Sequence, residues 1–191
     1  MKPHLVVMLG ISSVISVPAF AAQDGCPGGS YSVIVSPDQT TLSILFDKFQ
    51  VESTALDGAG VVSKVCHIVT PLDLPPNSSL GVYKVDYRGF AKLAPAQQAS
   101  LEVQYALGPR GNEHGRVFKR KVKGEHDGDY FFTEHIGAGQ MKRVGCGAEA
   151  KLDMTIALSV MGTSGAMASL DSSDGKSAAM VYHLNVKKCD E

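Results

Sequence analysis

Three Glu-His pairs lie within a short central stretch of the sequence, at positions 113–114, 125–126 and 134–135. Imidazole and carboxylate groups together are ligands that zinc, copper and nickel accept, and exported proteins use such sites. A metal site built from these pairs is therefore the first chemical hypothesis that the sequence raises. Whether the pairs can meet depends on the strands that carry them.

The spacing of the pairs spreads them along a predicted β-hairpin. If the strands on either side of residues 124–129 pair with each other, these residues form a charged loop that contains His126. A strand length, roughly 20 Å at 3.3 Å per residue, then separates His126 from His135. His114 and His135 can still meet across the base of the hairpin. The sequence therefore favours a polar loop, with a metal site of His114, His135 and Glu134 as the alternative.

Four cysteines form a second group with distinctive chemistry, namely Cys26, Cys66, Cys146 and Cys189. Their even number is typical of disulfide-bonded proteins from an oxidising compartment. Zinc is the competing use of four thiols, but the sequence has no Cys-x-x-Cys pair and the spacings are wide. Four cysteines allow three connectivities. We prefer Cys26 to Cys66 and Cys146 to Cys189, because each bridge then closes a loop within one half of the chain.

A cationic run from Arg116 to Lys123, RVFKRKVK, contains five cations in eight residues. In a strand, Lys119, Lys121 and Lys123 share one face and form a basic stripe. Such a stripe suits an anionic polysaccharide, a lipid head group or a nucleic-acid strand. The competing interpretation is an edge strand whose lysines prevent edge-to-edge pairing.

A further candidate binding surface lies in the segment VDYRGFAKL at residues 85–93. Alternation along this strand places Asp86 and Arg88 outward and Tyr83 inward. An exposed aromatic side chain beside an arginine is typical of binding faces, so Arg88 and Phe90 are candidates for a ligand platform. The competing interpretation is a cross-strand ion pair on a solvated face.

Sequence signatures of catalysis are missing. The chain has no Gly-x-Ser-x-Gly elbow, no His-Glu-x-x-His helix and no phosphate-binding loop, and disulfide formation would leave no cysteine as a nucleophile. We therefore expect no catalytic residues and no cofactor. The favoured function is binding or surface interaction, with an anionic glycan, another envelope component or a cell-surface protein as the partner. The alternative is a secreted hydrolase or a metal-binding protein that uses the Glu-His region.

The N-terminal residues are typical of a secretory signal peptide. Lys2 precedes an uncharged apolar run, and Ala19-Phe20-Ala21 matches the small-x-small cleavage pattern. We expect cleavage after residue 21, a secreted or periplasmic location, and a single domain over residues 22–191. No later stretch is long and apolar enough to span a membrane. The formal net charge of −1 argues against nucleic acid as a partner.

Alternating apolar and polar residues dominate the remainder of the chain, without a convincing amphipathic helix. The clearest strands are predicted at residues 101–107, 151–160 and 180–187. Turn residues such as Pro75-Pro76-Asn77 separate the earlier strands. About nine or ten strands without intervening helices indicate an all-β fold. We expect a two-sheet antiparallel β-sandwich stapled by disulfides, with a flattened barrel as the alternative.

Several landmarks along the chain resemble one known family. They are GCPGGSYSVIVSPDQTTLSILFDKF near the start, VDYRGFAKL, GDY at residues 128–130, Cys146-Gly147, and DSSDGKSAAMVYHLNVKKC at the end. In order and spacing they are similar to the family called domain of unknown function 4360. The resemblance implies small secreted proteins with a β-sandwich fold, paired cysteines and no assigned activity. It supplies no catalytic residues, and the Glu-His pairs are not part of its pattern.

Overall fold

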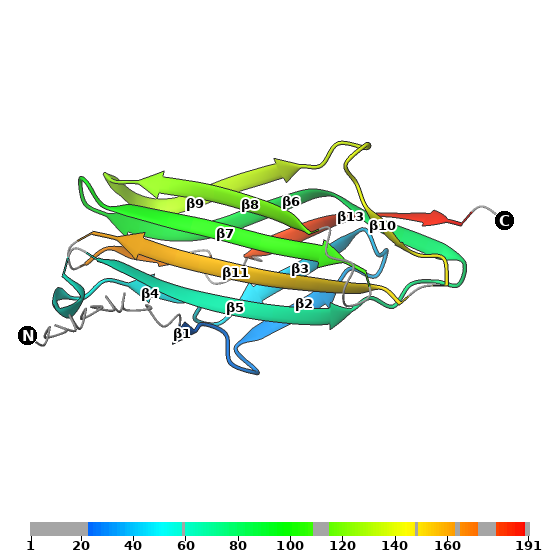
Figure 1. Cartoon of the computed structure of the whole chain (residues 1–191), viewed down its shortest axis with the longest axis horizontal. Coiled ribbons are helices and arrows are strands. Elements are labelled where there is room, and N and C mark those ends of the chain that lie inside the picture. The colour runs from blue at the N-terminus through cyan, green and yellow to red at the C-terminus, as the bar shows by residue number, and fades with distance from the viewer. Residues whose placement is uncertain are drawn as a thin grey trace, which may run out of the picture.

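Two β-sheets packed face to face make up the part of the chain that the computed structural model describes. That part comprises residues 23–58, 60–108, 115–147, 149–162, 165–171 and 179–189. The strands run along the long axis of the molecule (Figure 1). The predicted signal peptide lies outside the described residues. Within them, no helix has the length and apolar character needed to cross a membrane.

The first sheet has five strands and faces the viewer in Figure 1. In spatial order they are β1 (Gln23–Asp24), β5 (Val61–Pro71), β11 (Lys151–Met161), β7 (Gln98–Leu107) and β8 (Arg116–Lys123). β1 is parallel to β5, and all other neighbours are antiparallel. Among the described strands of this sheet, β8 has a neighbour on one side only.

The second sheet has eight strands and is centred on the long strand β6 (Ser78–Leu93). One side of β6 pairs with β13 (Met180–Lys188) and β12 (Met167–Ser169), and the other pairs with β9 (His126–His135) and β10 (Arg143–Gly145). Beyond β13 lie β3 (Thr41–Phe46) and β2 (Tyr31–Val35), and beyond β12 lies β4 (Gln50–Glu52). A short 3-10 helix, η1 (Ala55–Asp57), follows β4.

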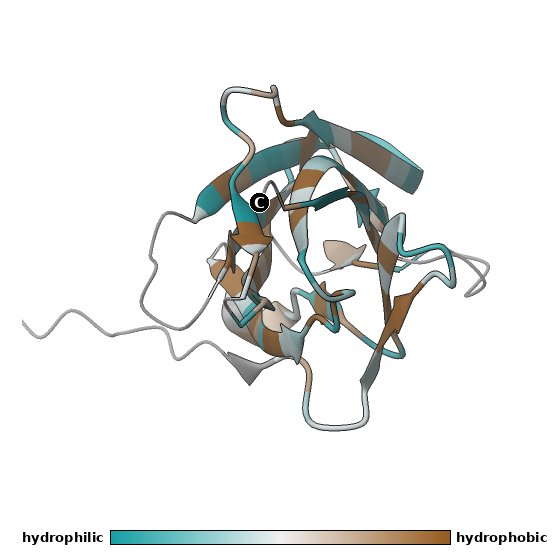
Figure 2. Cartoon of the chain, turned by 90° about the vertical axis from the view of Figure 1, so that its right-hand side faces the viewer, coloured by the Kyte–Doolittle hydropathy of each residue, from teal (hydrophilic) through white to brown (hydrophobic). Residues whose placement is uncertain are grey.

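Alternation along the strands builds the core between the sheets. In β11 every second side chain is buried, namely Leu152, Met154, Ile156, Leu158 and Val160. The same alternation appears as brown and paler bands along the strands (Figure 2). Full burial of one such side chain is worth about 1.5–3 kcal/mol. The buried side chains of both sheets form one hydrophobic cluster.

The predicted two-sheet antiparallel sandwich is confirmed. The described residues form thirteen strands rather than nine or ten. Four of these strands, β1, β4, β10 and β12, are only two or three residues long. A segment this short cannot show a periodic pattern, and for that reason the sequence did not reveal them.

The predicted hairpin on either side of residues 124–129 is wrong. β8 pairs with β7 in the five-stranded sheet, whereas β9 pairs with β6 in the eight-stranded sheet. The chain crosses between the sheets at Gly124, where a side chain would overlap the carbonyl oxygen of Ala94. The predicted charged loop is therefore a crossing of two residues, and residues 126–129 already belong to β9.

Two disulfides link residues that lie near the ends of the chain to other parts of the sandwich. Cys26 is bonded to Cys66 on β5, and Cys146 is bonded to Cys189 immediately after β13. This is the connectivity preferred from the sequence. Because all four cysteines are paired, none is left to bind zinc as a thiolate.

Candidate functional site

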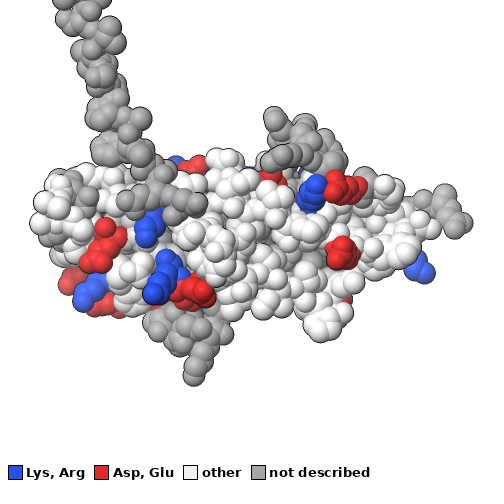
Figure 3. Space-filling view, turned by 90° about the horizontal axis from the view of Figure 1, so that it is seen from below, with Lys and Arg blue, Asp and Glu red and all other residues white. Residues whose placement is uncertain are grey.

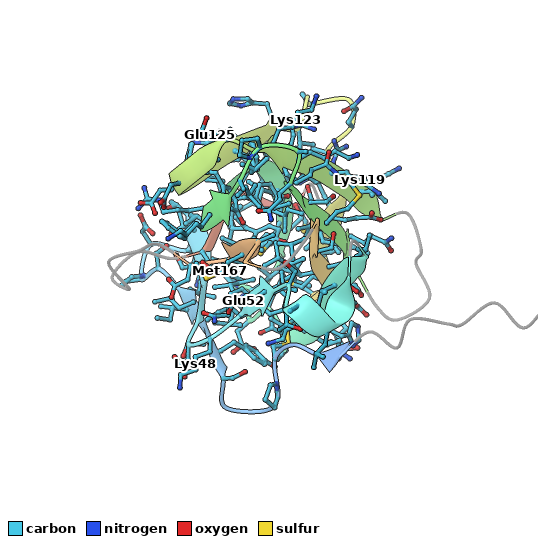
Figure 4. All side chains as sticks on the ribbon, turned by 90° about the vertical axis from the view of Figure 1, so that its left-hand side faces the viewer. Lys48, Glu52, Lys119, Lys123, Glu125 and Met167 are labelled. Carbon is cyan, nitrogen blue, oxygen red and sulfur yellow. A yellow bond between two sulfur atoms is a disulfide. The ribbon has the colours of Figure 1, made fainter. Side chains whose placement is uncertain are left out.

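The basic stripe, defined as Lys119, Lys121 and Lys123, lies on the outer face of the five-stranded sheet. Figure 4 shows Lys119 and Lys123 along the upper margin of the left-hand end, far from Lys48. Lys119 donates to Glu102 on β7 at 2.6 Å, and this bond lowers the pKa of Glu102. No carboxylate of the described residues lies within 4 Å of the ammonium group of Lys121 or Lys123. Two lysines of the stripe are thus available to an anionic ligand.

Uncharged polar side chains extend from the basic stripe across the sheet. We call this surface the polar face; it consists of Ser63, Gln98, Ser100, Gln104, Thr155 and Ser159. The strand registers align one row across four strands, in the order Lys121, Ser100, Ser159 and Ser63. At about 4.8 Å between strands, the row is roughly 14 Å long. The polar face therefore presents hydroxyl and amide groups beside Lys121 and Lys123, which no carboxylate of the described ranges approaches within 4 Å.

Arg88 and Phe90 lie on the outer face of the other sheet, so the structure does not bring them together with the basic stripe. Phe90 is half-buried there, opposite Asp129. The exposed aromatic side chain beside Arg88 is Phe131 on β9. Phe131 is 57% exposed, and the guanidinium carbon of Arg88 lies 5.9 Å from its ring centroid. Sequence reasoning missed Phe131, because only the register between β6 and β9 makes it the neighbour of Arg88.

Tyr83 departs from the predicted alternation. The register between β6 and β13 shifts so that His183 pairs with Lys84 while Leu184 pairs with Val82. Tyr83 is the extra residue of this bulge, and a bulge resets the alternation of the strand. The prediction that Tyr83 faces inward is therefore wrong. Its side chain is 44% exposed, and its ring lies 5.9 Å from the imidazole of His183.

Asp86 is the centre of a hydrogen-bonded cluster beside Tyr83. Its Oδ2 accepts from Lys84 Nζ and from His183 Nε2, each at 2.8 Å. Its Oδ1 accepts from Thr133 Oγ1 at 2.7 Å. Burial by itself would raise the pKa of Asp86, but the hydrogen bonds from Lys84, Thr133 and His183 hold it below the ordinary value of 3.8. The cluster therefore ties β6, β9 and β13 together through an ionised carboxylate.

Replacing Asp86 with asparagine should destabilise the protein at neutral pH but not in acid. A carboxylate with a lowered pKa in the folded state stabilises the fold above its unfolded pKa, and this contribution is lost as the pH falls through the folded pKa. We expect the variant to be less stable by about 1 kcal/mol at pH 7, allowing for partial solvent screening. The difference should shrink toward zero below pH 3.8. Urea unfolding of both proteins over a pH series measures it, and a difference independent of pH would contradict the assignment.

The two described residues of the metal alternative, Glu134 and His135, point to opposite faces of β9. Glu134 and His135 are consecutive on β9, so Glu134 is buried in the core while His135 is exposed on the outer face. His114 lies outside the described residues. His126 begins β9, and its Nε2 lies 3.0 Å from the carbonyl oxygen of Gly128. Within the described ranges, no group of three or more potential metal ligands comes together.

Glu134 instead forms a buried polar cluster between the two sheets. Its carboxylate accepts hydrogen bonds from the Tyr87 hydroxyl at 3.1 Å and from the Tyr105 hydroxyl at 3.2 Å. Arg116 donates a hydrogen bond from Nε to the same carboxylate at 3.0 Å, and its Nη2 forms an ion pair with that carboxylate at 2.9 Å. Burial raises the pKa of both tyrosines, so that their hydroxyls remain protonated donors. No sequence pattern predicts this cluster, because its four members come from four strands in two sheets.

The fold and its covalent links define a disulfide-bonded antiparallel β-sandwich protein. The chain belongs to the family described as domain of unknown function DUF4360, whose model matches residues 19–189. It is also similar to an uncharacterized secreted protein of the fungus Arthroderma benhamiae, with 26% identity over 134 residues. That match covers 68% of this chain and 52% of the fungal protein, so the chain spans about half the length of its relative. Two disulfides are typical of proteins that fold in an oxidising compartment.

Proposed function

We propose that this chain is an exported, non-catalytic protein, secreted or periplasmic, that binds an acidic polysaccharide on the polar face and the basic stripe. The observation that carries the proposal is the pair Lys121 and Lys123, which have no carboxylate within 4 Å among the described residues. The neighbouring hydroxyl and amide groups both donate and accept, as sugar hydroxyls require. A row of such groups across four strands suits an extended polymer rather than a small ligand.

The side of the molecule seen from below differs from β8 in how its charges are distributed. Seen from below, Lys and Arg atoms lie intermixed with Asp and Glu atoms near the left-hand end, and the centre of that side is largely uncharged (Figure 3). On β8, by contrast, five cations follow one another within eight residues. Arg116 and Lys119 are paired with Glu134 and Glu102, but Lys121 and Lys123 have no carboxylate within 4 Å among the described residues. A polyanion would therefore meet uncompensated positive charge at that end of β8.

Reversing two charges of the basic stripe tests the proposal. The variant Lys121→Glu/Lys123→Glu should bind polygalacturonate at least about tenfold more weakly than the wild type at low salt. Its affinity should also depend less on salt, because fewer screened ion pairs remain. Calorimetric titration at several NaCl concentrations measures both effects.

A matched control uses Lys187→Glu/Lys188→Glu, two exposed lysines at the end of β13 in the other sheet. This variant has the same net charge as the test variant, so it should retain wild-type affinity if the stripe is the site. Equal weakening by both variants would show a general charge effect and contradict the proposal, as would a wild-type protein that does not bind the polymer.

The competing explanation, protection of a free edge strand, predicts a different result. Lysines that guard β8 against pairing prevent association between copies. If that is their role, Lys121→Gln/Lys123→Gln should associate in sedimentation velocity while its affinity for polygalacturonate stays unchanged. Our proposal requires the reverse: a weakened affinity and an unchanged oligomeric state.

A further inference from the structure

The outer face of the eight-stranded sheet carries an exposed pair of side chains that neither the core nor the basic stripe explains. Phe131 is 57% exposed on β9, directly opposite Arg88 on β6. The guanidinium carbon of Arg88 lies 5.9 Å from the Phe131 ring centroid. No carboxylate of the described residues lies within 4 Å of the Arg88 guanidinium. The pair thus presents an apolar ring beside a cation that has no carboxylate partner in the part of the chain that the structure describes.

Structural roles do not account for this pair. An exposed phenylalanine buries little of its surface, and an exposed cation–π contact contributes only about 0.5–1 kcal/mol. Arg88 is also not a guard of a free edge, because β6 has strand neighbours on both sides. An arginine beside an exposed aromatic ring is, however, a typical centre of a binding surface.

The surroundings restrict the chemistry of the ligand. Lys84 and Arg88 both lie on this face, and the Asp86 carboxylate between them already accepts three hydrogen bonds. Lys84 is ion-paired with Asp86, whereas Arg88 has no carboxylate within 4 Å among the described residues. A guanidinium binds a carboxylate through two parallel hydrogen bonds, so Arg88 favours a carboxylated ligand. Arg88 is therefore the cation beside Phe131 that can pair with the ligand's anionic group.

We propose that this face is a second binding site, specific for a carboxylated sugar ring such as a uronic acid residue. The sugar carboxylate pairs with Arg88, and one face of the sugar ring packs on Phe131. Tyr83, 44% exposed at the bulge, lies five residues from Arg88 along β6, roughly 16 Å away, within reach of a longer chain. The site takes its class of ligand from the proposed function but uses no residue of the basic stripe.

Titration with trigalacturonate, followed by calorimetry or by amide chemical shifts, tests the second site. Arg88→Gln and Phe131→Ala should each weaken binding of the trimer by about tenfold or more. Matched controls on the same sheet are Lys187→Gln for the charge and Ile34→Ala for an exposed apolar side chain, which is 54% exposed. Both controls should bind like the wild type.

Three outcomes would overturn the second site. They are no binding of trigalacturonate to the wild type, unchanged affinity in Arg88→Gln and Phe131→Ala, and equal binding of the methyl-esterified trimer, which lacks the carboxylates. The Lys121→Glu/Lys123→Glu variant separates the two proposals. It should bind the trimer like the wild type while its affinity for the polymer is at least about tenfold weaker, so either proposal can fail while the other stands.

Discussion

Arg116→Met is expected to lower the free energy of unfolding by about 2–4 kcal/mol, because it leaves the buried Glu134 carboxylate without its cation. Arg116 donates a hydrogen bond to that carboxylate at 3.0 Å and forms an ion pair with it at 2.9 Å, and only the hydroxyls of Tyr87 and Tyr105 would remain. The Glu134 side chain is 10% exposed and cannot recover its hydration without opening the sandwich. Chemical unfolding with a matched wild-type control measures the loss.

A double variant shows whether the unpaired charge is the cause. Arg116→Met/Glu134→Leu removes both partners and should recover most of the stability lost in Arg116→Met, because replacing a whole buried ion pair by apolar side chains is often neutral. If Arg116→Met is as stable as the wild type, or if the double variant is less stable than the single one, the cluster does not hold the two sheets together as described.

The second large effect is expected from the disulfide between Cys26 and Cys66. Cys26→Ala/Cys66→Ala should lose about 3–5 kcal/mol of unfolding free energy, because the bond closes a loop with a sequence separation of 40 residues. For a protein of this size that corresponds to a fall in Tm of about 10 °C. Calorimetric scans of the wild type and the variant measure it, and a Tm within about 2 °C of the wild type would contradict the prediction.

The two disulfides should also differ in their accessibility to a reductant. Cys66 is fully buried, at 0% exposure, whereas Cys146 is exposed at the end of the sandwich. Exchange requires a thiolate to reach one of the sulfurs, so limited reduction of the folded protein should open Cys146–Cys189 first. Alkylation and peptide mass spectrometry identify the thiols. Preferential opening of Cys26–Cys66 would show that the buried bond is not protected by the core.

Strand periodicity predicted the parts of the fold that repeat regularly. The buried face of β11 follows from its sequence residue by residue, because both neighbours of this strand keep its register along its length. The connectivity of the cysteines also followed from the sequence, since the two bridges close separate halves of the chain. The sequence does not show to which sheet a strand belongs, because apolar and polar residues alternate in the same way in either sheet. For that reason β8 and β9 were paired incorrectly.

The candidate sites depend on contacts between residues far apart in the sequence, and here prediction from residue patterns was partial. The basic stripe was predictable because its three lysines lie on one strand. Phe131 and the partners of Asp86 were not, because the register between β6 and its neighbours places them together. The bulge at Tyr83 also shifts the register between β6 and β13 by one residue. Strict alternation along the sequence cannot predict such a shift. Glu134 is predicted as a candidate metal ligand, but in the structure it is the carboxylate of a buried ion pair with Arg116.

Hydrogen exchange of the protein with and without polygalacturonate tests the central claim most directly. If the acidic polymer lies on the polar face, amide protection should increase along β8 and in the neighbouring residues of β7, while β2 and β3 in the other sheet should exchange as in the free protein. Increased protection confined to the eight-stranded sheet, or no change in β8 at saturating polymer, would contradict the claim that the basic stripe is the principal binding surface.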